Sequence, residues 1–147
     1  MTSTSSPRWS IALWVVQILL ALLFAMAGSM KLVQPIDTLA MNMAWVDYTP
    51  APLVRFIGVC ETLGAIGLIV PAATRIQPFL TPLAAAGIAT IMVLAMGTHA
   101  YHAEWGALPV NLVLGGLAAF VSWGRVMRAP ITPRGELLRP IDHEGHA

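Results

Sequence analysis

The chain has 147 residues, of which 57% are hydrophobic and only 10% are charged. Soluble domains carry about 25% charged residues, so a lipid-facing surface is the simpler account of this composition. The net charge is +1 and no dense basic run occurs, which argues against a nucleic-acid partner.

Four apolar segments are each long enough to cross a bilayer, which requires about 20 mostly apolar residues in a helix. They predict helices near residues 11–29, 53–71, 79–99 and 106–123. Pro82 and Pro109 fall in the first turns of the third and fourth helices, where proline is tolerated, and the second helix is expected to end near Pro71. The glycines predicted to be positions of close helix packing are Gly87, Gly97, Gly115 and Gly116. The predicted fold class is all-α, an integral membrane four-helix bundle.

A cleavable signal peptide is the alternative interpretation of the first segment. Its apolar run is longer than the roughly 7–15 residues of a typical signal core. In addition, no small-x-small site is followed by a polar mature chain. We therefore predict a membrane span that is retained in the protein.

Lysines and arginines are unevenly distributed between the two sides of the predicted bundle. Both termini and the loop between the second and third helices share one side, which holds Arg8, Arg75, Arg125, Arg128, Arg134 and Arg139. The opposite side has only Lys31 and Arg55. Because cytoplasmic segments carry the excess of Lys and Arg, both termini are predicted to be cytoplasmic. The organisation is then an N-terminus at 1–10, a transmembrane domain at 11–124 and a polar tail at 125–147.

The loop at 33–52, on the outer side, is amphipathic. Its apolar residues Ile36, Leu39, Ala40 and Met43 recur at helical spacing. This pattern favours a short helix at the membrane interface, covering whatever lies between the outer ends of the spans. A simple connector is the alternative, because the pattern is short.

Polar side chains from all four spans converge in the outer half of the predicted bundle. They are Lys31, Arg55, Glu61, His99, Asn111 and, just beyond the third helix, His102. A charged side chain at mid-bilayer costs about 2.5–3.5 kcal/mol. We therefore expect Glu61 to face the protein interior beside the small residue Gly58. Its expected partners are Lys31, His99 or Thr98.

Two roles remain open for Glu61. In the first, the carboxylate is paired or neutral and only fastens the bundle. In the second, Glu61 and His99 are catalytic groups that handle protons. The ligand-binding residues of the second interpretation are Lys31, Arg55, Asn111 and His102, around an outward-facing pocket.

Three local patterns suggest cofactor or redox chemistry, and none is favoured. His99 and His102 lie near Glu104, but they lack a third ligand at zinc spacing, so an interfacial histidine pair is preferred. Met92, Met96 and His99 form a stripe that suits packing better than haem ligation. The single cysteine, Cys60, excludes an internal disulfide and a CxxC pair. We expect it to be an inert buried thiol that points away from Glu61.

Three stretches of the chain resemble the DoxX-like family of small four-helix membrane proteins. They are FAMAGSMKL at 24–32, LVRFIGVCETLGAIGLIVP at 53–71 and GTHAYHAEWGALPVNLVLGGLAAF at 97–120. The most specific element is the glycine–lysine end of the first helix followed by R-x-x-G-x-x-E in the second. The resemblance covers roughly residues 15–125. The positions at which the family tends to keep the same residue types are Lys31, Arg55, Gly58, Glu61 and His99.

The resemblance implies a protein of the bacterial inner membrane, similar to subunits of thiosulfate- or quinol-linked oxidoreductases. We expect an accessory or quinone-facing subunit of a membrane redox system, whose outer-half pocket binds a lipophilic small molecule. Quinone is one candidate for this molecule, and haem or metal is not expected. Direct electron transfer by this chain alone is not expected, because it has no cysteine pair and no clear haem or flavin motif. Besides the lipid bilayer, the expected partner is a membrane or periplasmic redox protein, and a homo-oligomer stays open.

Two alternative functions also stay open. One is a non-catalytic membrane protein that binds a lipophilic ligand or scaffolds a partner. The other is a cofactor-free membrane isomerase that uses Glu61 as an acid or base, since proton transfer alone requires no redox motif.

Overall fold

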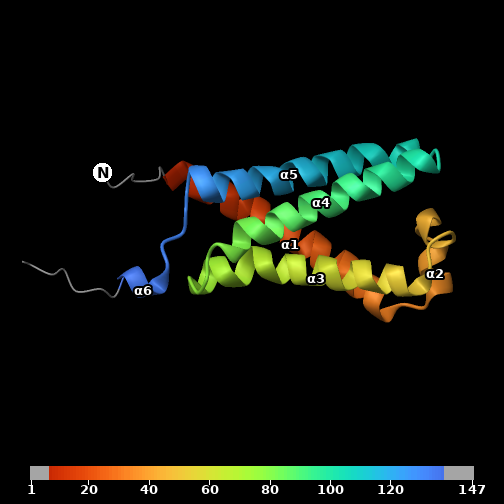
Figure 1. The fold of residues 1–147 in the computed structure, drawn as a ribbon, viewed down its shortest axis with the longest axis horizontal. Coiled ribbons are helices and arrows are strands. Elements are labelled where there is room, and N and C mark those ends of the chain that lie inside the picture. The colour runs from red at the N-terminus through yellow and green to blue at the C-terminus, as the bar shows by residue number, and fades with distance from the viewer. Residues whose placement is uncertain (1–6, 138–147) are drawn as a thin grey trace, which may run out of the picture.

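The structure, a computed structural model, describes residues 7–137 as a bundle of four long helices (Figure 1). These are α1 (Pro7–Val33), α3 (Ala51–Thr74), α4 (Leu80–Tyr101) and α5 (Leu108–Met127). The short elements are α2 (Ile36–Ala40), η1 (Ala44–Val46), η2 (Trp105–Ala107) and α6 (Arg134–Leu137). All four long helices are long and apolar enough to cross a membrane. The predicted all-α membrane bundle is confirmed for the described residues, whereas 1–6 and the end of the tail, with Arg139, lie outside them.

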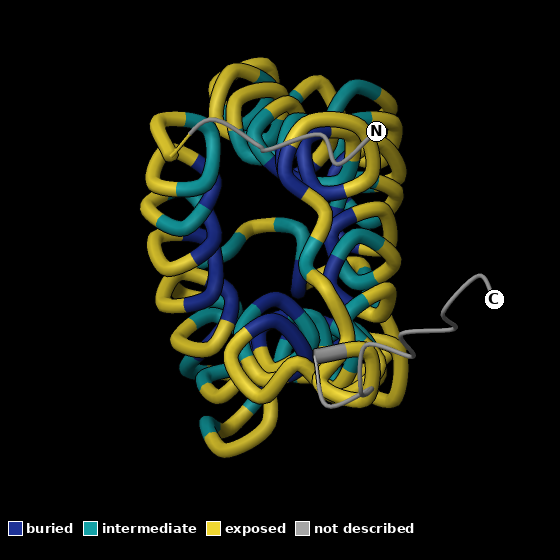
Figure 2. Tube along the Cα trace, turned by 90° about the vertical axis from the view of Figure 1, so that its left-hand side faces the viewer, coloured by how far each residue is buried: buried dark blue, intermediate teal, exposed yellow. Residues whose placement is uncertain are grey.

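The long helices form two closely packed pairs, α1 with α3 and α4 with α5. Contacts of α3 with α4 and of α1 with α5 close the ring. Viewed along the bundle, buried residues line the inner sides of the helices and exposed residues cover the outside (Figure 2). Leu20 of α1, Leu68 of α3 and Ile88 of α4 are at most 1% exposed and belong to one core cluster.

Many large apolar side chains lie on the outer surface of the bundle. Leu22, Leu63, Leu94 and Leu112, one from each long helix, are between 61% and 66% exposed. A helix that is apolar on all sides is either buried in a large protein or surrounded by lipid. Four helices of this kind are each long enough to cross a bilayer, so the second explanation fits, and the protein is a multi-pass membrane protein.

The helix predicted to end near Pro71 extends slightly beyond this residue. The helix continues to Thr74 with Pro71 inside it, and it ends where Arg75 adopts a left-handed backbone with φ of 58°. A proline in the last turn removes one backbone hydrogen bond and leaves the preceding turns intact. The left-handed residue after the last turn is a common helix stop.

The two ends of the bundle differ in the way they are closed. At one end, called here the α2 end, the loop between α1 and α3 folds onto the helices (Figure 1). Leu39, Val46 and Val54 form a small buried cluster there, with Ile36 and Met43 packed against it. The other end, called the α6 end, holds the start of α1, the loop between α3 and α4 and the segment that leads to α6.

Close helix packing involves only one of the four glycines predicted for it and includes others that were not predicted. A Cβ atom on Gly115 would come within 3.1 Å of Met92, as predicted, but Gly87, Gly97 and Gly116 have no neighbour within 4 Å. These three glycines lie on the outer surface, where no helix approaches. A close crossing that brings backbone against backbone lies between α1 and α3. There, a Cβ atom on Gly58 would lie 2.9 Å from the Cβ of Lys31 and 3.0 Å from the carbonyl oxygen of Gly28.

We predict that Gly58→Ala destabilises the bundle, because the added methyl group has no room between α1 and α3. Overpacking of this kind costs about 1–3 kcal/mol, which thermal unfolding of the purified protein in detergent measures. Gly87→Ala is the matched control, since its methyl group enters open space and improves helix propensity by about 1 kcal/mol. Equal loss of stability in both variants would contradict the close crossing.

Candidate functional site

Lys31 and Glu61 form a buried ion pair between α1 and α3. The Lys31 Nζ atom donates to both carboxylate oxygens, at 3.0 Å to Oε1 and 2.7 Å to Oε2. The two side chains are 7% and 5% exposed. Of the partners expected for Glu61, the structure selects Lys31, and the carboxylate faces the protein interior rather than lipid.

The position of Lys31 depends on the α1–α3 crossing. Gly28 and Gly58 bring the two helix backbones together directly beside the ion pair. Arg55 then holds the end of α1, because its guanidinium donates to the carbonyl oxygens of Lys31 and, at 2.8 Å, of Gln34. The last carbonyls of a helix lack intrahelical partners, and a basic side chain is a suitable donor for them.

Arg55 therefore does not lie at the ligand-binding position that was expected from the sequence. Its guanidinium is occupied by backbone carbonyls of α1 and the residue is absent from the cavity wall described next. Arg55 fixes the helix that carries Lys31, so its contribution to a site there is indirect.

A cavity of about 390 Å³ lies beside the ion pair, mainly between α3 and α4. Its walls are formed by Lys31, Trp45, Thr49, Leu53, Phe56, Ile57, Cys60, Glu61, Ile91, Met92, Leu94, Ala95, Thr98, His99 and Asn111. Most of these side chains are apolar, and the polar groups come from every long helix. This combination of apolar walls with a few polar groups is typical of small-molecule sites.

Asn111 is the polar group of this cavity whose hydrogen bonding is incomplete. Its Nδ2 atom is buried and has no partner among the described residues. A buried donor without a partner costs about 1–3 kcal/mol. A ligand with an acceptor oxygen would remove that cost.

His99 lines the same cavity and is coupled to Glu104 at the α2 end. The Nδ1 atom of His99 lies 2.5 Å from Oε2 of Glu104. The chain can make this contact because Ala103, with φ of 57°, turns it back after α4. The hydrogen bond from His99 is the main cause that lowers the pKa of Glu104 below its ordinary value of 4.5.

His102 does not line the cavity, contrary to the ligand-binding role expected for it. Its ring is stacked on Tyr48 at a centroid distance of 3.6 Å, and it is exposed. Tyr48 is in turn held beside Glu104. Desolvation and then the hydrogen bond to this carboxylate raise the pKa of Tyr48 to about 12. His102 thus belongs to the packing of the loop on the α2 end.

No three His, Cys, Asp or Glu side chains within residues 7–137 gather closely enough to hold a metal ion. Met92, part of the stripe that resembled haem ligation, is buried in the main core cluster and reaches the cavity wall from there.

A family model of the DoxX-like family matches residues 15–121. The chain belongs to the DoxX-like family. Searches of curated proteins and of solved structures gave no match to this DoxX-like chain.

The structure adds Trp45, Thr49 and Cys60 to the residues that surround the site in this DoxX-like protein. Cys60 was expected to point away from Glu61, but Cys60 and Glu61 both line the cavity. A signal for this wall was present in the sequence. Leu53, Phe56, Ile57 and Cys60 are spaced at i, i+3, i+4 and i+7, which places them on one face of a helix.

We predict that Lys31→Met in this DoxX-like protein is strongly destabilising, because Glu61 then remains as a buried charge without a counter-charge. Breaking a buried ion pair costs about 3–5 kcal/mol, whereas replacing both partners with apolar residues is often neutral. The double variant Lys31→Met, Glu61→Leu should therefore unfold at a higher temperature than Lys31→Met alone. A double variant that is less stable than either single variant would exclude this explanation.

The pair of His99 and Glu104 predicts a loss of stability in acid. Because the folded pKa of Glu104 is lowered below 4.5, its contribution is complete above that value and is lost as the pH falls through the folded pKa. The unfolding temperature of the wild type should therefore decrease below about pH 4.5, and Glu104→Gln should lack this component. Asp37→Asn, at an exposed position of the α2 end, serves as the control and should titrate like the wild type.

Proposed function

We propose that this protein binds a lipophilic molecule with a carbonyl-bearing headgroup, of the quinone class, in the cavity between α3 and α4. In this proposal it is an accessory or quinone-facing subunit of a membrane redox system. The single observation that carries the proposal is that one cavity joins apolar walls to the Asn111 amide, the Lys31–Glu61 pair and His99.

The shape of the cavity wall supports a ligand that arrives from lipid. Phe56 and Leu94, on facing helices, are 63% and 66% exposed and also line the cavity. A ligand can pass between them from the acyl chains to the polar groups without crossing water. A quinone matches this arrangement, because its tail is apolar and its carbonyl oxygens accept hydrogen bonds.

The polar groups have distinct roles in the proposal. Asn111 Nδ2 donates to one carbonyl oxygen of the headgroup. His99 lines the cavity with its Nδ1 held by Glu104, and in the proposal its other ring nitrogen exchanges a proton with the ligand. The Lys31–Glu61 pair provides a fixed electric field beside the ring, while its charges remain balanced.

The location follows from the same proposal. The excess of arginine at the α6 end favours a cytoplasmic location for that end, in a bacterial inner membrane. The α2 end then faces the periplasm, and a membrane or periplasmic redox protein is the partner that would exchange electrons with the bound quinone.

Titration of the purified protein with decylubiquinone tests this function. Trp45 lines the cavity, so its fluorescence should be quenched as the probe binds, and Trp45→Phe should remove most of the signal. Asn111→Leu should weaken binding about tenfold, the loss equivalent to one hydrogen bond of about 1.4 kcal/mol. Asn42→Leu is the matched control, because it removes an exposed amide at the same end that does not line the cavity.

Unchanged affinity in Asn111→Leu, or a saturable signal that persists in Trp45→Phe, would place the probe elsewhere and contradict the proposal. Mass spectrometry of lipid extracts from the purified protein provides an independent check. A quinone should be enriched in the wild type relative to Asn111→Leu.

A non-catalytic lipophilic-ligand-binding protein is the second candidate, and one observation favours it. Both carboxylate oxygens of Glu61 accept hydrogen bonds from Lys31, so this group is occupied in the structure. The same observation weighs against an isomerase that uses Glu61 as its acid or base. The second candidate would be supported if the protein binds quinone but its presence in membranes does not change the rate at which those membranes oxidise quinol.

A further inference from the structure

Arg125 is a buried cation near the α6 end, in the last turn of α5 and far from the cavity described above. Only 4% of the residue is exposed. Its Nε atom donates to Oε1 of Gln17 at 2.5 Å, and its guanidinium lies 5.2 Å from the ring centroid of Trp14. Its Nη1 atom lies 3.4 Å from the carbonyl oxygen of Ala129, which is a weak contact. Its Nη2 atom is buried and has no partner among the described residues.

The neighbours of Arg125 satisfy part of its hydrogen bonding but do not neutralise its charge. Gln17 is a neutral amide, and its own Nε2 atom is occupied by the carbonyl oxygen of Leu68 at 2.7 Å. The ion pairs found within residues 7–137 are Lys31–Glu61 and His99–Glu104, and Arg125 belongs to neither. A buried charge without a counter-charge is strongly unfavourable. An anion from outside the described chain would neutralise it.

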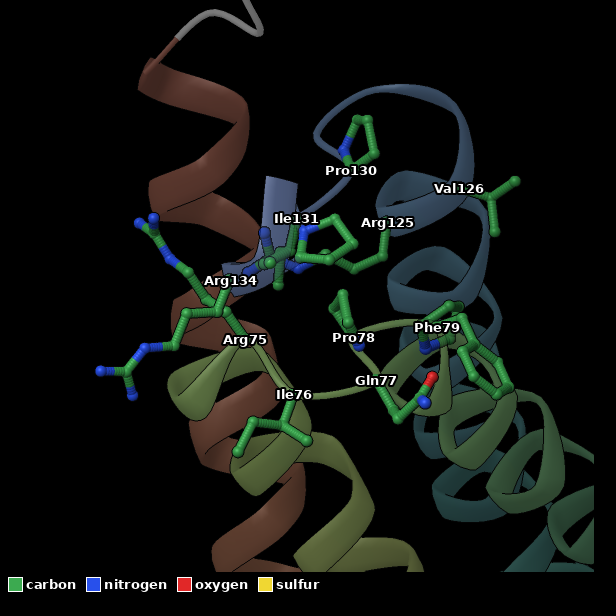
Figure 3. A pocket seen from close by; sticks show the side chains of 13 residues that line it. Arg75, Ile76, Gln77, Pro78, Phe79, Arg125, Val126, Pro130, Ile131 and Arg134 are labelled. Atoms are coloured by element: carbon green, nitrogen blue, oxygen red, sulfur yellow. The ribbon is translucent and has the colours of Figure 1, made fainter. Parts of the chain in front are cut away.

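Arg125 lies between two cavities that have room for such an anion. One, of about 280 Å³, is lined by Ser10, Trp14 and Thr132 together with Arg75 and Arg125. The other, of about 510 Å³, is lined by Arg75, Arg125 and Arg134 (Figure 3). No carboxylate occurs among the described residues that line either cavity. Their charged groups are all cationic, and the hydroxyl groups of Ser10 and Thr132 are further hydrogen-bond donors.

Arg75 and Arg134 are exposed and line the larger cavity together with Arg125. Figure 3 shows their side chains extending to the same side, away from the cavity, while the Arg125 side chain runs from α5 toward Ile131. The backbone N–H of Arg134 donates to the carbonyl oxygen of Arg75 at 3.0 Å, which joins α6 to the end of α3. Both side chains are exposed and long, so they can turn over a bound anion without moving the backbone.

We propose that Arg125, with Arg75 and Arg134, forms a binding site for a phosphate group, carried by an anionic phospholipid or present as free phosphate. Arginine suits phosphate because its planar fork donates two parallel hydrogen bonds to neighbouring oxygens. The depth is also suitable. Trp9 and Trp123 lie at this end, and Arg128 is placed over both rings at 5.5 and 5.2 Å. Tryptophan is enriched at the level of lipid headgroups.

Ligand addition to the purified full-length chain in a neutral maltoside detergent tests this site. The probes are dioctanoyl-phosphatidylglycerol, dioctanoylglycerol, which lacks the phosphate, and sodium phosphate. Phosphatidylglycerol should raise the unfolding temperature and bind in native mass spectra, and dioctanoylglycerol should do neither. A response to phosphatidylglycerol alone identifies a lipid headgroup as the source, and an equal response to sodium phosphate identifies the free anion. The full-length chain contains Asp142 and Glu144. The measured response therefore already includes any competition of these carboxylates with the added probes for the arginines.

The variants separate the site from a general effect of charge. Arg125→Gln should weaken phosphatidylglycerol binding at least tenfold. Arg75→Gln combined with Arg134→Gln alters only exposed positions and should weaken it several-fold, which keeps the test informative if Arg125→Gln does not fold. Arg128→Gln removes a charge at the same end outside both cavities and should bind like the wild type. Equal losses in Arg128→Gln and in the double variant, or no response to either phosphate probe, would overturn the proposal.

Discussion

The ion pair of Lys31 and Glu61 is the constraint on which the α2 end of the bundle depends. Two opposite charges inside an apolar bundle are tolerable only if they meet, and they meet only if α1 and α3 approach closely at Gly28 and Gly58. This approach makes α1 and α3 a tight pair, as α4 and α5 are on the other side. The cavity lies where α3 faces α4, between the two pairs. The carboxylate that stabilises one helix crossing therefore also forms part of the wall of the neighbouring cavity.

The two ends of the bundle bury a cation in different ways. Near the α2 end, Lys31 has a carboxylate that cancels its charge. Near the α6 end, Arg125 has the amide of Gln17, which satisfies one donor and cancels no charge. Hydrogen bonding and neutralisation are separate requirements in a medium of low polarity. The buried cation near the α2 end is neutralised within the described chain. The one near the α6 end is only partly hydrogen-bonded and has no counter-charge among the described residues. This difference explains why the proposed anion site lies at the α6 end.

Much of the fold followed from the sequence, because each apolar segment has the length of a span and ionisable residues in spans face protein. The same rule gave the interior position of Glu61 but left its partner open between Lys31, His99 and Thr98, and the structure shows Lys31. Three features did not follow from it. Arg125 lies at the boundary between a predicted span and a polar tail, where arginine is normally solvated, so its burial depends on the tertiary contact with Gln17. Glu104 reaches His99 through the left-handed backbone of Ala103, a conformation that alanine rarely adopts. Arg55 has the charge expected of a ligand-binding residue, but its guanidinium is hydrogen-bonded to backbone carbonyls at the end of α1.

The loop between α1 and α3 decides from which side the polar groups of the cavity can be reached. Leu39, Val46 and Val54 anchor this loop on the α2 end, and Trp45 lies with its ring centroid 5.8 Å from Lys31 Nζ. The loop therefore covers the ion pair on the side where the helices end. On the flank, the exposed side chains of Phe56 and Leu94 border the same cavity and are covered by no other helix. The polar groups of the cavity are thus covered at the helix ends and bordered by lipid-facing side chains. This arrangement suits a ligand that is already dissolved in the membrane. A water-soluble metabolite would have to lose its hydration shell among these apolar side chains before it reached Asn111.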